Sequence, residues 1–302
     1  MLVTLIHNPS AGRKTDEQAL RRLLLRAGHK VRYRSVKKAG WKRALKKEAD
    51  LIAVAGGDGT VGRIVRRMAG RKIPLAILPT GTANNIARTL GQVQRPFDEL
   101  VHAWEKAPRL KLDVCAAKGP WGERNFIEAV GLGLFADLMS RPDTEEKHAK
   151  RRRRGGAVES GLRDMRRAAE RSEAIELTAM LDGRDISGRY LMLEALNLNY
   201  VGPNMRLAVE TKPGDGHFEV VMVTEAERQR LVHYLERWQD DRERLAVLPS
   251  HRGKRLMIEW GGTALHIDDR LYPQEDPEPE ETAGMVEVTI DENASVDVLM
   301  PQ

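Results

Sequence analysis

Stretches of strand length alternate with amphipathic stretches over the first third of the chain. The strand-like stretches lie at Leu2–Ile6, Lys30–Ser35, Leu51–Ala55 and Pro74–Leu78. Between them, apolar residues recur at helical spacing, as they do over residues 15–28. Alternating strands and helices predict a parallel sheet, and ligands of such sheets lie at the carboxyl ends of the strands.

The ends of the first expected helix carry local signals. Thr15, with Gln18 three residues later, has the pattern of a capping box, and Gly28 is placed to end the helix. A second, basic helix is expected over residues 37–47, where lysines and arginines dominate. Runs of this kind are most often solvated faces.

The pattern changes after about Leu110. Strand candidates then follow one another with few helices between them, at residues 110–114, 125–130, 175–181, 190–199, 218–223, 255–259, 264–267, 285–290 and 295–299. Asp182 and Gly183 form a hairpin signal, and 225–247 is one longer helical stretch. The sequence therefore predicts an α/β fold, with an N-terminal doubly wound parallel sheet and a second domain that is largely antiparallel β.

Composition narrows the class of protein. The chain has 302 residues, of which 41% are hydrophobic and 31% charged, as in soluble globular proteins of two domains. A net charge of +6 favours an anionic partner such as a nucleotide, a nucleic acid or an acidic membrane surface, although many proteins with a mild basic excess bind none of these. Cys115 is the single cysteine, and the N-terminal residues lack a signal-peptide pattern. We therefore expect a cytoplasmic protein.

A glycine-rich turn follows the apolar run Leu51–Ala55 and precedes a helical stretch. Its residues are Gly56, Gly57, Asp58, Gly59 and Thr60. Consecutive backbone N–H groups in such a turn, together with a helix N-terminus, form an anion site. The alternative is a tight connection without a ligand. Asp58 would repel a phosphate unless a cation lay between them, which indicates a nucleotide bound with Mg²⁺.

Two further polar turns follow strands, at Asn8–Gly12 and Thr80–Asn84. A doubly wound sheet would bring these turns to the same edge as Gly56–Thr60. Ser10 and Lys14 in the first of them are candidates to hold phosphate.

These motifs resemble the nucleotide-binding loops of the diacylglycerol kinase catalytic-domain family, which includes bacterial lipid kinases and is related to sphingosine kinases. Residues 56–60 match the family's second loop, Asn8–Gly12 its first, and Leu78–Arg88 its third. NAD kinases share the GGDGT turn but lack the other two loops in this form. The similarity extends over most of the chain, through Asp113, Gly131–Gly133, Asp215–Gly216 and Val296–Pro301.

The resemblance implies a kinase that transfers the γ-phosphate of ATP, with Mg²⁺, to the hydroxyl of a diacylglycerol-like lipid. It implies a nucleotide-binding domain at 1–112, to which 294–302 return, and a β-rich substrate domain at 113–293. Asp268 matches the family's general base. The residues that it assigns to nucleotide binding are Asn8, Pro9, Ser10, Gly56, Gly57, Asp58, Gly59, Thr60, Arg63, Thr80, Gly81, Thr82 and Asn84.

The chain departs from the family at three acidic positions. Arg63 replaces a glutamate that would complete a capping box with Thr60 as N-cap, and Arg270 replaces the glutamate of the Asp-Gly-Glu motif. Lys212 stands where an acid is expected three residues before Asp215, so Asp215 is the remaining candidate for a structural metal ligand. The alternative function is therefore a catalytically silent relative that binds nucleotide or lipid.

Residues 147–171 are strongly basic, with apolar residues at helical spacing. Two interpretations are open: a helix at an anionic membrane surface, which would make the protein peripheral, or an ordinary surface helix packed by its apolar stripe. Nucleic-acid binding is the weakest alternative, because aromatic residues make up only 5% of the chain and no binding motif is present. The oligomeric state is left open, with a homodimer as one option.

Overall fold

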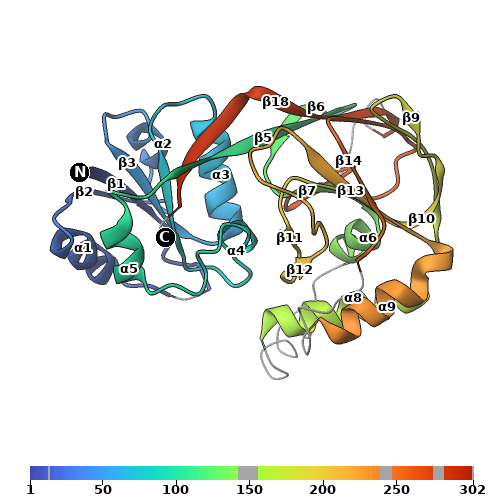
Figure 1. The fold of residues 1–302 in the computed structure, drawn as a ribbon, viewed down its shortest axis with the longest axis horizontal. Helices are drawn as coiled ribbons and strands as arrows, with labels where there is room; N and C mark the ends of the chain where they lie inside the picture. Colours follow the sequence, from blue (N-terminus) through green and yellow to red (C-terminus); the bar gives the residue numbers. More distant parts are fainter. Residues whose placement is uncertain (13, 142–155, 239–246, 275–281, 301–302) are drawn as a thin grey trace. The chain divides into compact units, whose positions relative to one another are not determined.

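The computed structural model describes residues 1–302 except 13, 142–155, 239–246, 275–281 and 301–302 (Figure 1). The chain forms two compact units, Met1–Val114 with Asp291–Gln302 and Cys115–Ile290. It passes from the first unit to the second within strand β5 (Arg109–Gly119) and returns within β18 (Gly284–Leu299). A parallel sheet in the first unit and antiparallel strands in the second confirm the predicted fold class.

The first unit is built on a parallel sheet with the strand order β4-β3-β1-β2. The strands are β1 (Leu2–His7), β2 (Lys30–Ser35), β3 (Leu51–Gly56) and β4 (Leu75–Pro79). Strand β18 adds to the β4 edge, also in parallel. All residues of β3 and β4 are buried because both strands are paired on either side and covered on both faces.

Helices cover the two faces of this sheet. They are α1 (Glu17–Arg26), α2 (Trp41–Ala44), α3 (Asp58–Met68), α4 (Asn85–Thr89) and α5 (Phe97–Ala103). α1 and α5 pack on one face, where Leu20 and Leu24 meet Leu100 and Val101 in one core cluster with alternate residues of β1 and β3. α3 lies on the opposite side of the sheet in Figure 1.

Two local predictions in this unit were wrong. The N-cap of α1 is Asp16 rather than Thr15: its carboxylate accepts a hydrogen bond from the N–H of Ala19 at 2.8 Å. The basic helix predicted over residues 37–47 is confined to Trp41–Ala44, because Gly40 in the left-handed region starts it and tight turns follow it.

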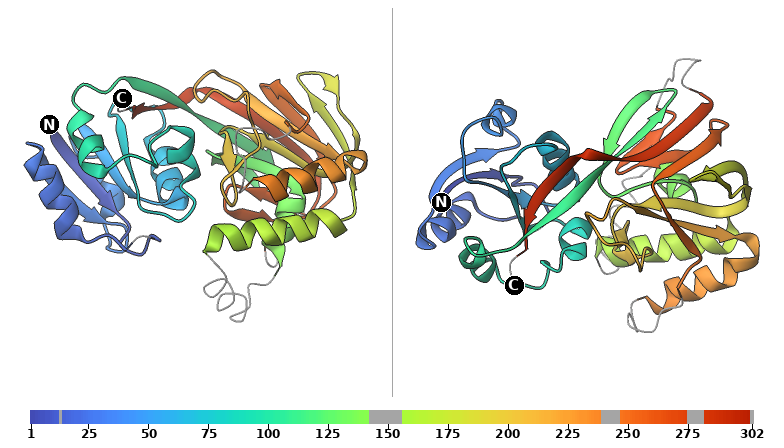
Figure 2. Two further views of the ribbon diagram at one scale, coloured as in Figure 1. Left: turned by 60° about the horizontal axis from the view of Figure 1, so that its bottom comes forward. Right: turned by 45° about the horizontal axis from the view of Figure 1, so that its top comes forward.

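The second unit consists largely of antiparallel strands (Figure 2). One path through the sheet runs β17-β16-β7-β10-β8-β15-β18, and β13 pairs with both β10 and β14. The strands are β6 (Gly122–Phe126), β7 (Ala129–Gly133), β8 (Ile175–Leu181), β9 (Arg184–Asp185), β10 (Gly188–Leu196), β11 (Tyr200–Val201), β12 (Met205–Arg206), β13 (Phe218–Thr224), β14 (Ser250–Gly253), β15 (Arg255–Trp260), β16 (Leu265–Ile267) and β17 (Arg270–Tyr272).

Helices of the second unit are α6 (Leu134–Ser140), α8 (Ala157–Arg171) and α9 (Arg228–Arg237), the last preceded by the 3₁₀ turn Glu225–Glu227. The predicted apolar stripe of α8 is buried: Leu162, Met165 and Ala169 pack in one cluster with residues of α6 and α9. Residues 147–155 of the basic stretch lie outside the described residues. No helix in the described part of the chain is long and apolar enough to cross a membrane.

Candidate functional site

The three polar turns of the first unit lie against one another at the carboxyl ends of β1, β3 and β4. The side-chain amide of Asn8 donates to the hydroxyl of Thr60 at 2.9 Å, which joins the first turn to the second. The N–H of Asn8 donates to the carbonyl of Ala55, and the N–H of Thr80 to that of Gly56, at 2.8 and 3.0 Å. The predicted turns therefore form one loop cluster.

Glycines permit this approach because the turns touch through their backbones. A Cβ atom on Gly81 would lie 2.3 Å from the Cα of Gly57, and one on Gly57 would lie 2.9 Å from the Cα of Gly81. A Cβ on Gly12 would lie 2.6 Å from the hydroxyl oxygen of Thr82. Any side chain at these positions would push the turns apart. The absence of side chains leaves a backbone-lined cradle, the kind of surface that phosphate groups approach closely.

Asp58 makes its hydrogen bonds within the protein. Its Oδ1 accepts from the N–H of Ile86 at 3.0 Å, near the start of α4, and so ties the second turn to the third. Burial raises the pKa of the Asp58 carboxyl above its ordinary value. Hydrogen bonds from the backbone at Ile86 and Asn85 lower this pKa, but they offset the effect of burial only in part. Asp58 therefore ties the second turn to the third. The sequence led us to expect a contact with Mg²⁺ at Asp58 but did not reveal this structural role.

The capping-box argument for Thr60 and Arg63 was wrong. α3 begins at Asp58 with Gly57 as its N-cap, so Thr60 lies inside the first turn of the helix, with its buried hydroxyl bonded to Asn8. Arg63 consequently falls in the second turn, where it is exposed. Gly57 takes the extended backbone conformation of an N-cap, with φ of −94° and ψ of −176°, so the helix begins earlier than the threonine signal suggests.

Asn84 closes the third turn on itself. Its backbone adopts a left-handed conformation with φ of 55°, and its buried side chain both accepts from the N–H of Gly81 at 2.8 Å and donates to the carbonyl of Gly81 at 2.9 Å. The left-handed region is tolerated by asparagine better than by most residues. Asn84 therefore fixes the position of Gly81 against Gly57.

No group of three or more His, Cys, Asp or Glu side chains within the described ranges is arranged to hold a metal ion. Asp215 instead pairs with Arg252 at 2.6 Å and accepts from the N–H of His217 at 3.1 Å. Mg²⁺ commonly keeps several waters and binds through substrate phosphates plus one or two carboxylates.

Asp268, the residue matched to the family's base, lies in the second unit directly after β16. Its carboxylate accepts from the backbone N–H groups of Ile127, Glu128 and Ala129, with the shortest distance, 2.8 Å, to Glu128. Its own backbone is left-handed, with φ of 51°, and its N–H donates to the carbonyl of Ala129. The three N–H donors therefore hold the carboxylate in one orientation. Arg270 lies two residues further on in β17, exposed to solvent.

A buried ion pair supports the turn that carries Asp268. Nε2 of His266 lies 2.8 Å from Oε2 of Glu194, and the two side chains are 2% and 0% exposed. Gly131 leaves the room for it, since a Cβ there would lie 2.1 Å from the Glu194 carboxylate. Nδ1 of His266 faces the carbonyl of Asp268 at 3.2 Å. Sequence reasoning missed this pair, although a glutamate inside the apolar run Leu191–Leu196 was a visible signal.

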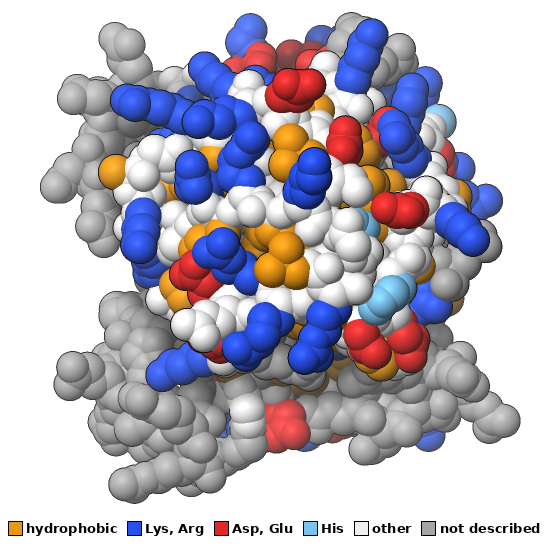
Figure 3. Space-filling view, turned by 90° about the vertical axis from the view of Figure 1, so that its left-hand side faces the viewer, with side chains coloured by type: hydrophobic (Ala, Val, Ile, Leu, Met, Phe, Trp, Pro, Cys, Tyr) orange, Lys and Arg blue, Asp and Glu red, His pale blue; other side chains and the backbone are white. Residues whose placement is uncertain are grey.

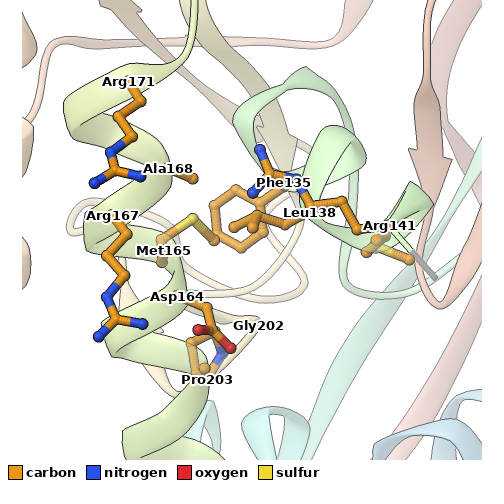
Figure 4. A pocket seen from close by; sticks show the side chains of 12 residues that line it. Phe135, Leu138, Arg141, Asp164, Met165, Arg167, Ala168, Arg171, Gly202 and Pro203 are labelled. Carbon is orange, nitrogen blue, oxygen red and sulfur yellow. The ribbon is translucent and has the colours of Figure 1, made fainter. Parts of the chain in front are cut away.

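A cavity of about 560 Å³ opens between α6, α8 and the turn that joins β11 to β12 (Figure 4). Figure 4 shows Phe135 and Leu138 from α6 facing Met165 across it, with Arg167 and Arg171 along α8. The polar lining consists of Arg141, Asp164, Arg167 and Arg171. The ring of Phe135 also packs against His266, with ring centroids 6.1 Å apart. The cavity is amphipathic and adjoins the ion pair beneath Asp268.

We expect Asp58→Ala to lower the free energy of unfolding by about 1–2 kcal/mol, as for the loss of a helix-capping carboxylate. The reason is the lost acceptor for the N–H of Ile86. Asp58→Asn retains an oxygen there and serves as the matched control, with a smaller loss. Urea denaturation measures both, and an alanine variant as stable as the parent would contradict the tie.

His266 makes the stability of the second unit depend on pH. Burial lowers the pKa of the imidazole, but the charge and hydrogen bond of Glu194, together with the carbonyl and charge of Asp268, raise it by more, so that the pKa of His266 lies above 6.5. Because the pKa of His266 is higher in the folded state than in the unfolded state, protonated His266 stabilises the fold. This stabilisation is complete below about pH 6.5 and is lost as pH rises through the pKa of the folded state. We therefore expect the difference in unfolding free energy between the parent and His266→Gln to shrink with rising pH. His233→Gln, at an exposed histidine, is the control and should show no comparable trend. A pH-independent difference at His266 would refute the pairing.

Comparisons with known proteins agree with these observations. Residues 2–117 match the Diacylglycerol kinase catalytic domain. The chain is 26% identical over 232 residues to the Diacylglycerol kinase of Bacillus subtilis (strain 168), an alignment that covers 74% of this chain and 73% of the relative.

Solved structures show the same fold. A structure described as a diacylglycerol kinase from Bacillus anthracis str. Sterne matches with a TM-score of 0.73 and 20% identity, covering 99% of this chain and 96% of that one. Yeast NADH kinase complexed with NADH matches more distantly, with a TM-score of 0.52, 11% identity, and coverage of 100% and 84%. Residues 2–117 are thus similar to the diacylglycerol kinase catalytic domain, and 74% of the chain aligns with a diacylglycerol kinase.

Proposed function

We propose that this protein is an ATP-dependent lipid kinase that phosphorylates the hydroxyl of a diacylglycerol-like lipid. The observation that carries the proposal is the loop cluster of the first unit, where Gly57 and Gly81 meet backbone to backbone at the ends of β3 and β4. The match to the diacylglycerol kinase catalytic domain and the similarity to a diacylglycerol kinase support the reaction class.

The nucleotide half of the reaction is assigned to the loop cluster. Backbone N–H groups of the three turns would bind the phosphates of ATP, in the cradle that side chains at the glycine positions would fill. The residues that line this cradle are Asn8, Pro9, Ser10, Gly56, Gly57, Gly59, Thr60, Thr80, Gly81, Thr82 and Asn84. Pro9 has no N–H group, and those of Asn8, Ser10, Thr60, Thr80 and Gly81 already donate within the protein, so these residues would shape the cradle. Mg²⁺ bound with the nucleotide would offset the negative charge of the phosphates. The contacts of Asp58 fit a supporting role: it holds the second and third turns together.

The acceptor half is assigned to the second unit. Asp268 would take the proton of the lipid hydroxyl while the hydroxyl oxygen attacks the γ-phosphorus of ATP. The bond from that phosphorus to the bridging oxygen breaks at the same time, and ADP leaves. Three backbone N–H donors fix the direction of the carboxylate. The Glu194–His266 pair beneath it holds the turn from the other side.

The cavity between α6 and α8 supports a lipid as the acceptor. Phe135, Leu138 and Met165 give it an apolar wall that suits acyl chains, while arginines of its lining suit the polar end of an amphipathic molecule. Ligand sites of this kind are mostly apolar with a few placed polar groups. A soluble polar acceptor would gain nothing from that wall.

A catalytically silent relative is the second candidate. Arg270 favours it, because an exposed guanidinium stands where the family motif has a carboxylate. Lys212 favours it as well, since its cationic side chain replaces an acid beside Asp215.

Transfer of labelled phosphate from γ-labelled ATP to a panel of lipids distinguishes the two candidates. We expect turnover by the parent and a loss of about a hundredfold or more in Asp268→Asn, the usual scale for a general base. Nucleotide affinity should change little, because the first unit is untouched. Asp269→Asn, at the exposed neighbouring carboxylate, is the matched control. A parent that binds ATP yet phosphorylates no lipid would favour the silent relative, and an active Asp268→Asn would remove Asp268 from the mechanism.

A further inference from the structure

A second cavity in the first unit is lined almost wholly by cations. It has a volume of about 310 Å³ and lies between the turn around α2 and the C-terminal part of α3. Its lining consists of Lys42, Arg43, Leu45, Lys46, Arg67 and Arg71. Leu45, only 2% exposed, is the single apolar member. Among the described residues that line this cavity, no carboxylate is present.

Two of the arginines are held in place by the fold. The guanidinium of Arg67 lies over the ring of the buried Trp41, 5.6 Å from its centroid, and donates to the carbonyl of Arg63 at 2.9 Å. Arg71 donates to the carbonyl of Leu45 at 2.5 Å, which ties the end of α3 to the end of the α2 turn. Stacking and backbone bonds of this kind reduce the entropy that a guanidinium loses when it binds an anion.

Positive charge is much denser in this part of the chain than in the protein as a whole. Residues 30–72 contain fourteen lysines and arginines and three carboxylates, for a net charge of +11, whereas the whole chain has +6. The space-filling view in Figure 3 shows Lys and Arg side chains spread over the face turned to the viewer, with fewer Asp and Glu side chains among them. Like charges so close together favour an anion between them.

Helix electrostatics explain only part of this arrangement. Cations near a helix C-terminus are favourable, which accounts for Arg67 near the end of α3. α2 has four residues, so its dipole is a weak reason for Lys42, Arg43 and Lys46 to share one cavity. The cavity is also separate from the loop cluster, because α3 has 11 residues and runs about 16 Å from Asp58 to its far end.

We propose that this cavity is a second anion site that binds a phosphate-bearing group, distinct from the nucleotide loops. Arginine guanidinium groups bind phosphate oxygens in a two-pronged manner, and lysine ammonium groups add charge without a fixed direction. The volume suits one or two phosphate groups. The phosphate belongs either to a small soluble anion or to the headgroup of an anionic lipid, and the inference does not depend on the kinase activity.

The test uses the full chain and two probes. Inorganic pyrophosphate is titrated by calorimetry, and sedimentation is measured with phosphatidylcholine vesicles that contain or lack phosphatidylglycerol. The cavity variant combines Lys42→Gln with Lys46→Gln, and the control combines Lys30→Gln with Lys106→Gln, which removes the same charge from the same unit. All four side chains are exposed, so both variants should fold as the parent does. The indole N–H resonance of Trp41, beneath Arg67, reports binding locally.

We expect the cavity variant to bind its anion about tenfold or more weakly, as for the loss of charge-assisted hydrogen bonds, and the control to bind nearly as the parent does. A shift of the Trp41 resonance with pyrophosphate alone identifies a soluble anion, and binding to phosphatidylglycerol vesicles alone identifies a lipid headgroup; either result supports the site. Equal losses in the two variants would show diffuse surface charge instead. An unchanged Trp41 resonance with pyrophosphate, together with equal sedimentation of the cavity variant and the parent with phosphatidylglycerol vesicles, would also overturn the proposal.

Discussion

The backbone contact between Gly57 and Gly81 is the constraint on which the candidate nucleotide site depends. β3 and β4 are neighbours in a parallel register that pairs Gly56 with Pro79, so their turns leave the sheet side by side. The turns can meet only because neither glycine has a side chain. Asn84 and Asp58 then fix the contact from the third and second turns. The second and third turns are thereby held against each other at one edge of the sheet.

One kind of interaction occurs in both units: the carboxylate of an aspartate accepts hydrogen bonds from backbone N–H groups of a different segment. Asp58 caps the segment at Ile86, and Asp268 caps the segment at 127–129. Their surroundings differ, because Asp268 rests on a turn that faces the buried Glu194–His266 pair. Removing one partner of such a pair leaves an uncompensated buried charge, so the pair makes the turn under Asp268 sensitive to protonation.

Local patterns were sufficient for the alternating strands, for the glycine turns and for the hairpin at Asp182 and Gly183, whose positive φ values fit the turn that joins β8 to β9. They failed where the outcome depends on contacts distant in sequence. Thr60 has the pattern of an N-cap, but Asn8 engages its hydroxyl inside the helix. Glu194 and His266 are 72 residues apart, and no periodicity links them. The two cavities likewise arise from tertiary packing rather than from any run of residues.

Backbone amide resonances during a titration with Mg-ATP test the central claim most directly. The account predicts that the largest shifts fall on Gly12, Gly57, Gly59 and Gly81, and that Gly81→Ala abolishes them, because its Cβ would displace Gly57. Gly261→Ala, where a Cβ meets no atom within 4 Å and the backbone φ is not positive, is the control and should bind as the parent does. Shifts that fall elsewhere, or that survive in Gly81→Ala, would contradict the assignment of the loop cluster to the nucleotide.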